Sequence, residues 1–341
     1  MSCNTPKRIL FIRPSALGDV CRSVPVVTSL KKRWPETSID WLVQTEFLDA
    51  VSAHPAIENV IPFQRQEMRR WYTPKGLLLT LRFLRVLKSK KYDLVIDGQG
   101  LGRSGIFTWA THAAVRIGLA SAREFGWLGY TKKVQVNCKH TVDQMLALSE
   151  AAGAPSITDM QLYTHKRDEL WWESFKEKNS VTTYAVLAPT SRWKSKQWPV
   201  ERFVSLAAHF MEKGMQVVVV GAPNEEDQIA PLLELDKTIN VMPEMTIGRL
   251  MAVIASSTIV VANDSAALHI AVGFNRPCVG LFGPTDPSKV GPYKCDKSTV
   301  AANVDYGAVN YRDCAGNQLM QQIDIQEVIE RIETICRQDN E

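Results

Sequence analysis

The sequence lacks any apolar run long enough to cross a membrane. Its apolar stretches, such as Met251–Ile254, are far shorter than the roughly 20 residues that a membrane-spanning helix needs. The apolar run Ile9–Ile12 is four residues long and ends at Arg13, so it lacks the length of a signal-peptide core. We therefore expect a cytoplasmic protein that does not span a bilayer.

The sequence also lacks the short patterns that build disulfide frameworks or hold metals. Its seven cysteines are odd in number, widely scattered and never spaced as C-x-x-C. No D-x-D occurs, although a close pair of carboxylates is a common way to hold a divalent cation. We therefore expect neither a bound metal nor another cofactor, and charge on a substrate must be met by groups of the protein.

The net charge is small but unevenly distributed. The chain carries a formal charge of +4, whereas Gln64–Tyr92 alone holds nine Lys and Arg residues against one acidic residue, Glu67, and so carries +8. The rest of the chain is therefore at −4. This local basic character suits an anionic surface or an anionic substrate, and it does not indicate bulk binding of nucleic acid.

Length and periodicity indicate two α/β domains. At roughly 150 residues per domain, a chain of 341 residues favours two. Short β-branched runs alternate with longer helical patterns from Arg8–Ile12 onward, and a second series opens at Tyr184–Pro189. We predict doubly wound parallel sheets in residues 1–154 and 183–322, joined by a linker region at 155–182. Residues 323–341 form an amphipathic helix, for which packing back on the first domain is one option.

Ligands of such sheets bind in a crevice where the strands end, but one pattern there is misleading. Gly100, Gly102 and Gly105 match G-x-G-x-x-G after the predicted strand Leu94–Asp97. A dinucleotide fingerprint belongs on the first strand and needs an acidic residue at the end of the second, whereas Glu124 lies in no strand pattern. We expect these glycines to let a loop pass closely beneath a ligand.

A carboxylate follows the first predicted strand. Asp19 comes after the turn of small residues Pro14–Gly18 and at the start of a helical pattern. A carboxylate in that place is a candidate general base, and the alternative is an aspartate that caps the helix.

Two segments of the second domain suit anions. Thr190, Ser191 and Lys196 follow one strand, and their hydroxyl and ammonium groups fit a diphosphate, with a solvated loop as the alternative. Asn263–His269 begins a helix after another strand with small residues, and such an N-terminus binds phosphate. His269, one turn into the helix, is either a donor to the same phosphates or a structural histidine.

Together these segments resemble glycosyltransferase family 9, the ADP-heptose lipopolysaccharide heptosyltransferases, and most of all its heptosyltransferase I branch. The resemblance covers nearly the whole chain and rests on four ordered motifs, which are Ser15–Asp19, Thr190–Pro199, Asp264–His269 and Phe282–Pro287. The family implies a GT-B fold with two Rossmann-like lobes facing a central cleft. It also implies metal-independent transfer of a sugar with inversion at the anomeric carbon.

The resemblance further implies roles for individual residues. Asp19 would deprotonate the acceptor hydroxyl. The nucleotide sugar would be held by Thr190, Ser191, Lys196, Glu225, Met245, Asp264, Ser265, Ala266, Ala267 and His269. In this set Glu225 matches the ribose-binding acid, a role that Glu226 could take instead, and Met245 would lie on adenine. Ala266 departs from the family, which usually has glycine there, and its methyl group limits close approach of the backbone to a ligand.

On the acceptor side, the resemblance points to Arg69, Arg70 and Arg123 as the residues that meet a lipid A core glycolipid. The Arg123–Glu124 pair resembles an acceptor-side pair of heptosyltransferase I. The cations Arg82, Arg85 and Lys88 are equally well explained by a solvated helix face.

The implied donor is an ADP-sugar, with ADP-heptose first. The implied location is the cytoplasm, with peripheral contact to the inner membrane and no nucleic-acid partner. Two other interpretations stay open. One is a sugar-nucleotide 2-epimerase-like enzyme of the same architecture, and the other is a non-catalytic protein that binds nucleotide sugars.

Overall fold

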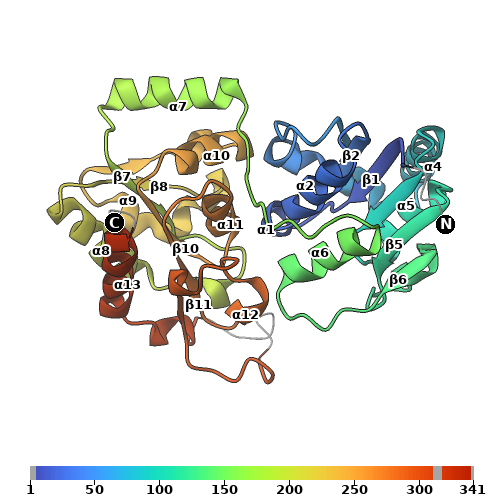
Figure 1. The fold of residues 1–341 in the computed structure, drawn as a ribbon. Coiled ribbons are helices and arrows are strands. Elements are labelled where there is room, and N and C mark those ends of the chain that lie inside the picture. Colours follow the sequence, from blue (N-terminus) through green and yellow to red (C-terminus); the bar gives the residue numbers. More distant parts are fainter. Residues whose placement is uncertain (1–4, 310–316, 339–341) are drawn as a thin grey trace. The chain divides into compact units, whose positions relative to one another are not determined.

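The computed structural model describes residues 5–309 and 317–338. The chain divides into two compact units, Met1–Tyr163 and Thr164–Glu341 (Figure 1). The boundary falls inside the region predicted as a linker, so residues 155–163 belong to the first unit and residues 164–182 to the second.

The first unit is built on a parallel six-stranded sheet with the order β3-β2-β1-β4-β5-β6. Its strands are β1 (Arg8–Ile12), β2 (Ser38–Gln44), β3 (Asn59–Phe63), β4 (Leu94–Asp97), β5 (Val115–Leu119) and β6 (Lys132–Val134). The apolar residues of β1 are fully buried, as expected for a strand covered on both faces. The strand order reverses between β1 and β4, so the loops after these two strands lie where doubly wound sheets bind ligands.

The helical pattern that starts at Asp19 and extends to Arg33 is divided in the structure between two helices, α1 (Leu17–Cys21) and α2 (Val24–Arg33). A continuous helix would need the Pro25 N–H to bond to the Cys21 carbonyl, and proline has no N–H. Pro25 instead lies in the first turn of α2, where no such bond is required. Arg22 is therefore the C-cap of α1, the helix that carries Asp19.

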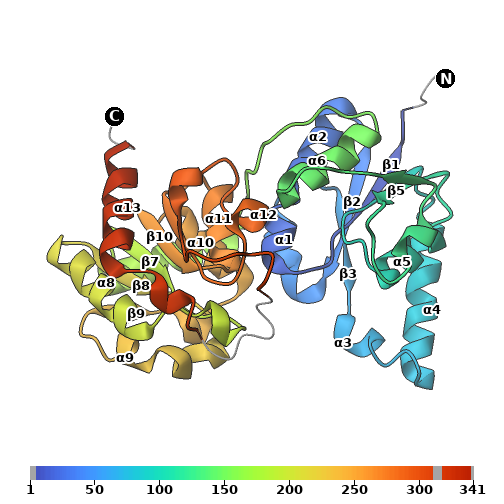
Figure 2. The same ribbon diagram turned by 90° about the horizontal axis from the view of Figure 1, so that it is seen from below.

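The other helices of the first unit flank its sheet. They are α3 (Arg65–Met68), α4 (Pro74–Ser89), α5 (Gly102–Ala110) and α6 (Thr141–Ala151), with the 3-10 helices η1 (Thr45–Ala50) and η2 (Gly126–Gly129). Helix α4 lies against α5 (Figure 2). It contributes Leu79, Phe83 and Leu87 to a core that also holds residues of β1 and β3.

Two glycines near β4 are required by packing within the first unit. A side-chain carbon on Gly102 would lie 2.6 Å from the Glu124 carbonyl oxygen, and one on Gly105 would lie 2.3 Å from the Gly126 carbonyl oxygen. These glycines therefore allow η2 to pack its backbone on α5, and their expected role beneath a ligand stays a prediction. Gly100 differs from them because its φ of +65° is a backbone conformation that favours glycine.

The second unit holds another parallel six-stranded sheet, with the order β12-β11-β10-β7-β8-β9. Its strands are β7 (Tyr184–Ala188), β8 (Gln216–Val219), β9 (Thr238–Asn240), β10 (Ile259–Asn263), β11 (Cys278–Phe282) and β12 (Thr299–Ala301). Here the order reverses between β7 and β10, so the loops after β7 and β10 correspond to those after β1 and β4. Two doubly wound parallel sheets are thus confirmed.

The helices of the second unit are α7 (Lys166–Asn179), α8 (Val200–Glu212), α9 (Ala230–Leu233), α10 (Ile247–Ala255), α11 (Ala266–Gly273), α12 (Pro287–Val290) and α13 (Ile325–Gln338). Its 3-10 helices are η3 (Lys194–Lys196), η4 (Pro223–Ile229), η5 (Met242–Glu244), η6 (Asp296–Ser298) and η7 (Met320–Gln322). Elements η4 and α9 do not form one continuous helix, because Pro231 cannot donate the hydrogen bond that would join them.

Both ends of the second unit differ from the prediction. Helix α7 occupies part of the predicted linker and packs on α10, and the indole N–H of its buried Trp172 lies 2.9 Å from the Tyr184 hydroxyl. Helix α13 packs on α8, β11 and β12 and buries Val328, Ile332 and Ile335 in the core of the second unit. The apolar face of this helix is thus covered within its own unit, whereas the sequence left packing on the first domain as one option.

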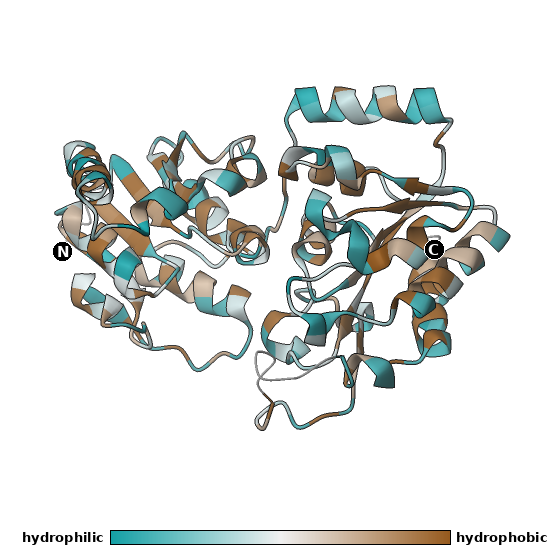
Figure 3. Cartoon of the chain, turned by 180° about the vertical axis from the view of Figure 1, so that it is seen from behind, coloured by the Kyte–Doolittle hydropathy of each residue, from teal (hydrophilic) through white to brown (hydrophobic). Residues whose placement is uncertain are grey.

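Apolar side chains are concentrated in the two sheets. Figure 3 shows their strands mainly in brown, whereas α7 is largely teal. Among the described residues, no helix has both the length and the apolar character needed to span a bilayer. Cys3 and Cys314 lie outside the described residues, and the other five cysteines are free thiols.

Candidate functional site

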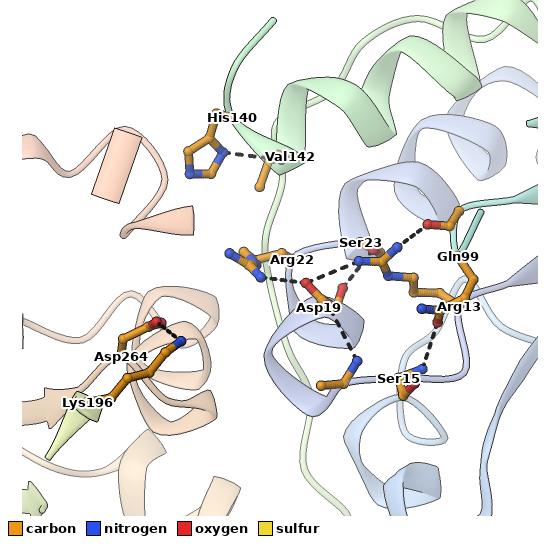
Figure 4. Close-up of polar contacts among 12 residues, drawn as sticks. Arg13, Ser15, Asp19, Arg22, Ser23, Gln99, His140, Val142, Lys196 and Asp264 are labelled. Carbon is orange, nitrogen blue, oxygen red and sulfur yellow. Dashed lines mark hydrogen bonds and ion pairs between the residues drawn. The ribbon is translucent and has the colours of Figure 1, made fainter. Parts of the chain in front are cut away.

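Asp19 lies on α1, just after the carboxyl end of β1, and two arginines contact its carboxylate (Figure 4). Nη2 of Arg22 is 2.5 Å from Oδ1, and Nη2 of Arg13 is 3.1 Å from the same oxygen. Among the described residues, Oδ2 accepts one hydrogen bond, from the Ala16 N–H at 3.2 Å. Asp19 therefore caps α1, which agrees with the alternative to a general base. Among the described residues, its Oδ2 nevertheless has fewer contacts than Oδ1.

The charges around Asp19 favour its ionised form. Burial raises the pKa of this carboxyl and is the largest single effect, but the charges of Arg13 and Arg22 oppose it, and the net result is a pKa lowered from 3.8 to about 2. The hydrogen bonds from Ala16 and Arg22 act in the same direction. Asp19 is therefore an anion at neutral pH, and its side chain is 27% exposed and can be reached by a ligand.

The loops after β1 and β4 are tied together around Asp19. The buried Arg13 also donates a hydrogen bond to the Gly98 carbonyl, and the Ser15 N–H donates to Oε1 of Gln99 at 3.1 Å. Because the Arg13 guanidinium contacts both the backbone after β4 and the Asp19 carboxylate, the sheet fixes its position beside Asp19.

A pocket in the first unit lies beside this loop. Its lining residues come from the carboxyl ends of β2 and β3, from the loops after β1, β4 and β5, and from α3 and α5. They include Ser15, Arg65, Gln99, Arg103 and Glu124 but not Asp19. Burial lowers the pKa of Arg103, and the nearby charge of Arg65 lowers it further, whereas Glu124 opposes them. Arg65 and Arg103 were not predicted as site residues, because their proximity depends on the fold.

The predicted acceptor residues are only partly brought to this pocket. Arg69, Arg70 and Arg123 are all exposed, and none of them is among its lining residues. The charge of Arg69 lowers the pKa of Arg103, which places Arg69 within electrostatic range of the pocket. No such interaction is recorded for Arg70 or Arg123 among the described residues.

In the second unit, the loop after β7 meets the loop after β8. Thr190 is buried and its hydroxyl donates a 2.6 Å hydrogen bond to Oε2 of Glu225, which also accepts the Ala222 N–H at 3.1 Å. Glu226 instead accepts a 2.6 Å hydrogen bond from Asn240 of β9. Of the two acids, Glu225 is therefore the one that the fold joins to another predicted donor-site residue.

Lys196 and Asp264 form a close ion pair at the ends of two strand loops (Figure 4). Nζ of Lys196 is 2.6 Å from Oδ2 of Asp264, and the two side chains are 14% and 11% exposed. Lys196 comes from η3 after β7, and Asp264 follows β10. Two predicted residues 68 positions apart in the chain are thus in contact.

Asn263 fixes these two loops to each other, although the sequence analysis assigned it no role. Its side chain is fully buried, donates to the Pro189 carbonyl at 2.6 Å and accepts from the Trp198 N–H at 3.1 Å. One amide therefore holds both ends of the loop that contains Thr190, Ser191 and Lys196. A side chain without both a donor and an acceptor could not satisfy both groups.

The start of α11 presents unsatisfied donors. Ser265 is its N-cap, yet the Ser265 side chain makes no capping hydrogen bond, and its buried Oγ has no partner among the described residues. The first N–H groups of a helix have no partner within the helix, and their dipoles favour an anion. Buried Oγ1 of Thr285, in the turn after β11, is likewise without a partner. Unpartnered buried hydroxyls are costly, so these groups suit a bound anion.

Ala266 and Ala267 open α11, directly after Ser265. Ala266 is not among the described residues with positive φ, so the backbone there does not require the glycine that the family usually has. His269 is buried, at 3% exposure, whereas Met245 is half-buried after η5. The burial of His269 is what the alternative of a structural histidine predicts.

A pocket of the second unit lies next to the predicted nucleotide-sugar residues but does not include them. It is lined by residues that include Gln197, Trp198, Glu201, Gln228 and Asn317, and none of the predicted nucleotide-sugar residues contributes to it. The groups of the second unit that suit an anion, around Lys196 and Ser265, therefore lie outside this pocket. In the described part of the chain, no cluster of three or more His, Cys, Asp or Glu residues has metal-binding geometry.

Comparisons with known proteins cover both units. The model for glycosyltransferase family 9 (heptosyltransferase) matches residues 80–315. Lipopolysaccharide heptosyltransferase 1 of Pseudomonas aeruginosa is 30% identical over 301 residues, which are 84% of this chain and 81% of the relative. The structure of E. coli heptosyltransferase WaaC with ADP has a TM-score of 0.77 at 26% identity and covers 96% of this chain and 99% of that one. The same enzyme with ADP-2-deoxy-2-fluoro heptose gives 0.76 at 25% identity, with the same coverage.

Proposed function

Because the chain belongs to glycosyltransferase family 9 and has the predicted GT-B fold, we propose that it transfers a heptose from ADP-heptose to the inner core of lipopolysaccharide. The transfer inverts the anomeric carbon and needs no metal. The observation that carries the proposal is the arrangement at the start of α11, where the Lys196–Asp264 pair adjoins the unpartnered hydroxyl of Ser265.

The second unit binds the donor in this proposal. The diphosphate accepts hydrogen bonds from the N-terminus of α11, from Ser265 and Thr285, and from Lys196. Hydrogen bonds from oriented amides and hydroxyls, together with one ammonium group, can meet the charge of a leaving diphosphate. The proposal further places Thr190, Ser191, Asp264, Ala266, Ala267 and His269 in or behind this cradle, Glu225 on the ribose and Met245 on adenine.

The first unit supplies the base. The acceptor hydroxyl oxygen forms a bond to the anomeric carbon of the heptose while the bond from that carbon to the diphosphate oxygen breaks. The electron pair of the broken bond leaves with ADP, and the hydroxyl proton moves to Oδ2 of Asp19. This oxygen is the natural acceptor because both arginines contact Oδ1.

The low pKa of Asp19 fixes when it acts. A carboxylate with a pKa of about 2 is a weak base toward an alcohol that has not yet reacted. Proton transfer therefore follows C–O bond formation, which makes the hydroxyl strongly acidic, rather than preceding it. Arg13 and Arg22 keep the carboxylate ionised and oriented until that point.

The acceptor in this proposal is a lipid A core glycolipid, and the enzyme works at the cytoplasmic surface of the inner membrane. Such an acceptor carries phosphates and acidic sugars, which suit the cationic pocket residues Arg65 and Arg103. Exposed Arg69, Arg70 and Arg123 extend this positive charge at the surface.

The decisive experiment supplies ADP-heptose together with a heptose-free lipid A core. The proposal expects ADP release coupled one-to-one with a heptosylated product, unchanged by EDTA, and opposite anomeric configurations in donor and product by NMR. Release of ADP, or epimerisation of the sugar, without an acceptor would contradict it in favour of an epimerase-like enzyme. Loss of activity in EDTA that Mg²⁺ restores would contradict metal independence.

A further inference from the structure

The first unit exposes a group of large apolar side chains around the start of α4. We name the α4 face by five residues, Trp71, Tyr72, Leu77, Leu78 and Leu81. Trp71 and Tyr72 are 61% and 73% exposed, and the three leucines are between 42% and 47% exposed. Monomeric soluble proteins expose single apolar residues routinely, but neighbouring groups of them mark interaction sites.

The geometry of α4 separates this face from the core. Leu79, Phe83 and Leu87 point into the core of the first unit, at the 3.6-residue spacing of one helix side. Leu77, Leu78 and Leu81 fall on the remaining circumference, and the rings of Trp71 and Tyr72, 6.5 Å apart, immediately precede the helix. The first half of α4 is thus apolar on both sides, although one side has no protein partner among the described residues.

Cations surround the α4 face. Lys75, Arg82, Arg85 and Lys88 are all exposed on α4, and Glu67 is the single acidic residue between residues 64 and 92. Long basic side chains can extend their charged ends outward while their methylene groups cover apolar surface. The combination of leucines, two interfacial aromatic rings and a rim of Lys and Arg is typical of helices that lie in a membrane interface.

We propose that the α4 face is the surface by which this protein docks on a bilayer containing anionic lipids. Leucine side chains and the two rings enter the headgroup region, and the cations of α4 meet lipid phosphates. Each Lys or Arg near such a surface strengthens binding by about fivefold, and this gain falls with salt. The docking does not depend on heptose transfer, since it needs neither donor nor acceptor.

Charge decides against two other occupants. A second copy packed through the same face would oppose Lys75, Arg82, Arg85 and Lys88 to their own counterparts, without acidic side chains to pair with them. Nucleic acid would use the cations, but it gains little from three exposed leucines beside them. An anionic bilayer is the partner that uses both the charges and the apolar side chains.

The test is co-sedimentation with vesicles of phosphatidylcholine alone or with 30% phosphatidylglycerol, over a series of salt concentrations. The wild-type chain is expected to bind the anionic vesicles, and more weakly as salt rises. The charge variant Arg82→Gln/Arg85→Gln/Lys88→Gln removes three cations that the proposed reaction does not use. It should weaken binding by about 100-fold at low salt.

A matched control removes three exposed lysines elsewhere, as Lys32→Gln/Lys178→Gln/Lys237→Gln. This variant has the same net charge as the charge variant and is expected to bind nearly as well as wild type. Equal weakening in the two variants would overturn the proposal, because the attraction would then come from overall charge.

The apolar variant Leu77→Gln/Leu78→Gln/Leu81→Gln keeps good helix formers at exposed positions, so α4 should still fold. It is expected to lose vesicle binding that persists at high salt in wild type, with unchanged circular dichroism and unchanged ADP affinity. The proposal of docking on lipid would be overturned if this variant bound vesicles as tightly as the wild-type chain. It would also be overturned if the wild-type chain formed a dimer and this variant did not. Unchanged ADP affinity keeps this result separate from any failure of the proposed transfer.

Discussion

Replacing Lys196 by methionine should weaken ADP binding strongly. Lys196 contacts Asp264 at 2.6 Å in a site where both side chains are largely buried. If Lys196 also binds the diphosphate, its removal has two effects. It deletes a charged hydrogen bond to the ligand, and it leaves the Asp264 carboxylate unpaired beside an anionic ligand.

The size of the loss follows from these two effects. A hydrogen bond to a charged group contributes about 1.5 to 3 kcal/mol, which corresponds to roughly 10- to 150-fold in Kd. Repulsion between the unpaired carboxylate and the diphosphate adds to this loss. Asp264→Asn should therefore bind ADP at least as tightly as wild type. The double variant Lys196→Met/Asp264→Asn should recover about tenfold of the loss in Lys196→Met.

Isothermal titration calorimetry with ADP measures these four affinities without any acceptor. The matched control is Lys213→Met, because Lys213 forms an exposed ion pair with Glu333 at 3.0 Å, and this control should leave the Kd unchanged. If Lys196→Met binds ADP within about threefold of wild type while circular dichroism shows a folded chain, Lys196 serves only as the structural partner of Asp264. The assignment of this loop to diphosphate would then be refuted.

Three more predictions concern the first unit. Asp19→Ala should lower kcat by at least ~10²-fold and leave ADP affinity nearly unchanged, as loss of a base does, and wild-type turnover in this variant would remove Asp19 from the mechanism. Because the pKa of Asp19 falls from 3.8 to about 2 on folding, its ionisation stabilises the folded chain above pH 3.8, and that stabilisation is lost as the pH falls through 2. In urea unfolding, Arg22→Gln should lose less free energy of unfolding than wild type between pH 5 and pH 2. Equal losses in the two proteins would contradict the ion pair between Arg22 and Asp19. Arg69→Gln/Arg70→Gln should raise the KM for the acceptor and flatten its dependence on salt, whereas loss of ADP binding instead would reverse the assignment of the two units.

The sequence predicted the central strands well because they are buried on both faces. Strands such as β1 and β10 are continuous apolar runs, and that pattern requires no knowledge of their neighbours. Strand β5 was not predicted because Arg116 and Gly118 interrupt its pattern. In the fold, a side-chain carbon on Gly118 would lie 2.2 Å from the ring of Tyr130, whose hydroxyl reaches Asp97 at 2.7 Å. That reason for a glycine depends on a contact that sequence spacing does not reveal.

Helix α7 was read as a linker for a similar reason. Its residues are mostly charged, and the side chains it buries include Asp168 and Trp172, too few for a clear helical stripe. Asp168 packs where Gly248 of α10 has no side chain. The position of α7 thus depends on its packing against α10 rather than on a hydrophobic pattern in its own sequence.

At the site, motifs located the residues but not their partners. The pairing of Lys196 with Asp264 and of Thr190 with Glu225 joins loops that are distant in sequence, so only the fold brings them together. The bridging role of Asn263 was not predicted for the same reason, because its place in the sequence does not show that it joins two loops. Thr285 lies within the motif Phe282–Pro287, but its unpartnered hydroxyl depends on burial, which the motif does not show.

The place of β1 in the middle of its sheet has a consequence for synthesis on the ribosome. Strands β2 and β3 can extend one edge soon after β1 emerges, but the other edge waits for β4, which begins at Leu94, 82 residues after Ile12. At about 5 to 20 residues per second, that delay is roughly 4 to 16 seconds. The second unit repeats it, since the partner β10 of β7 begins at Ile259, 71 residues after Ala188. Each nascent sheet therefore passes through a stage with an apolar, unpaired edge that can join to another chain, so crowded expression should favour aggregation before the native sheets are complete.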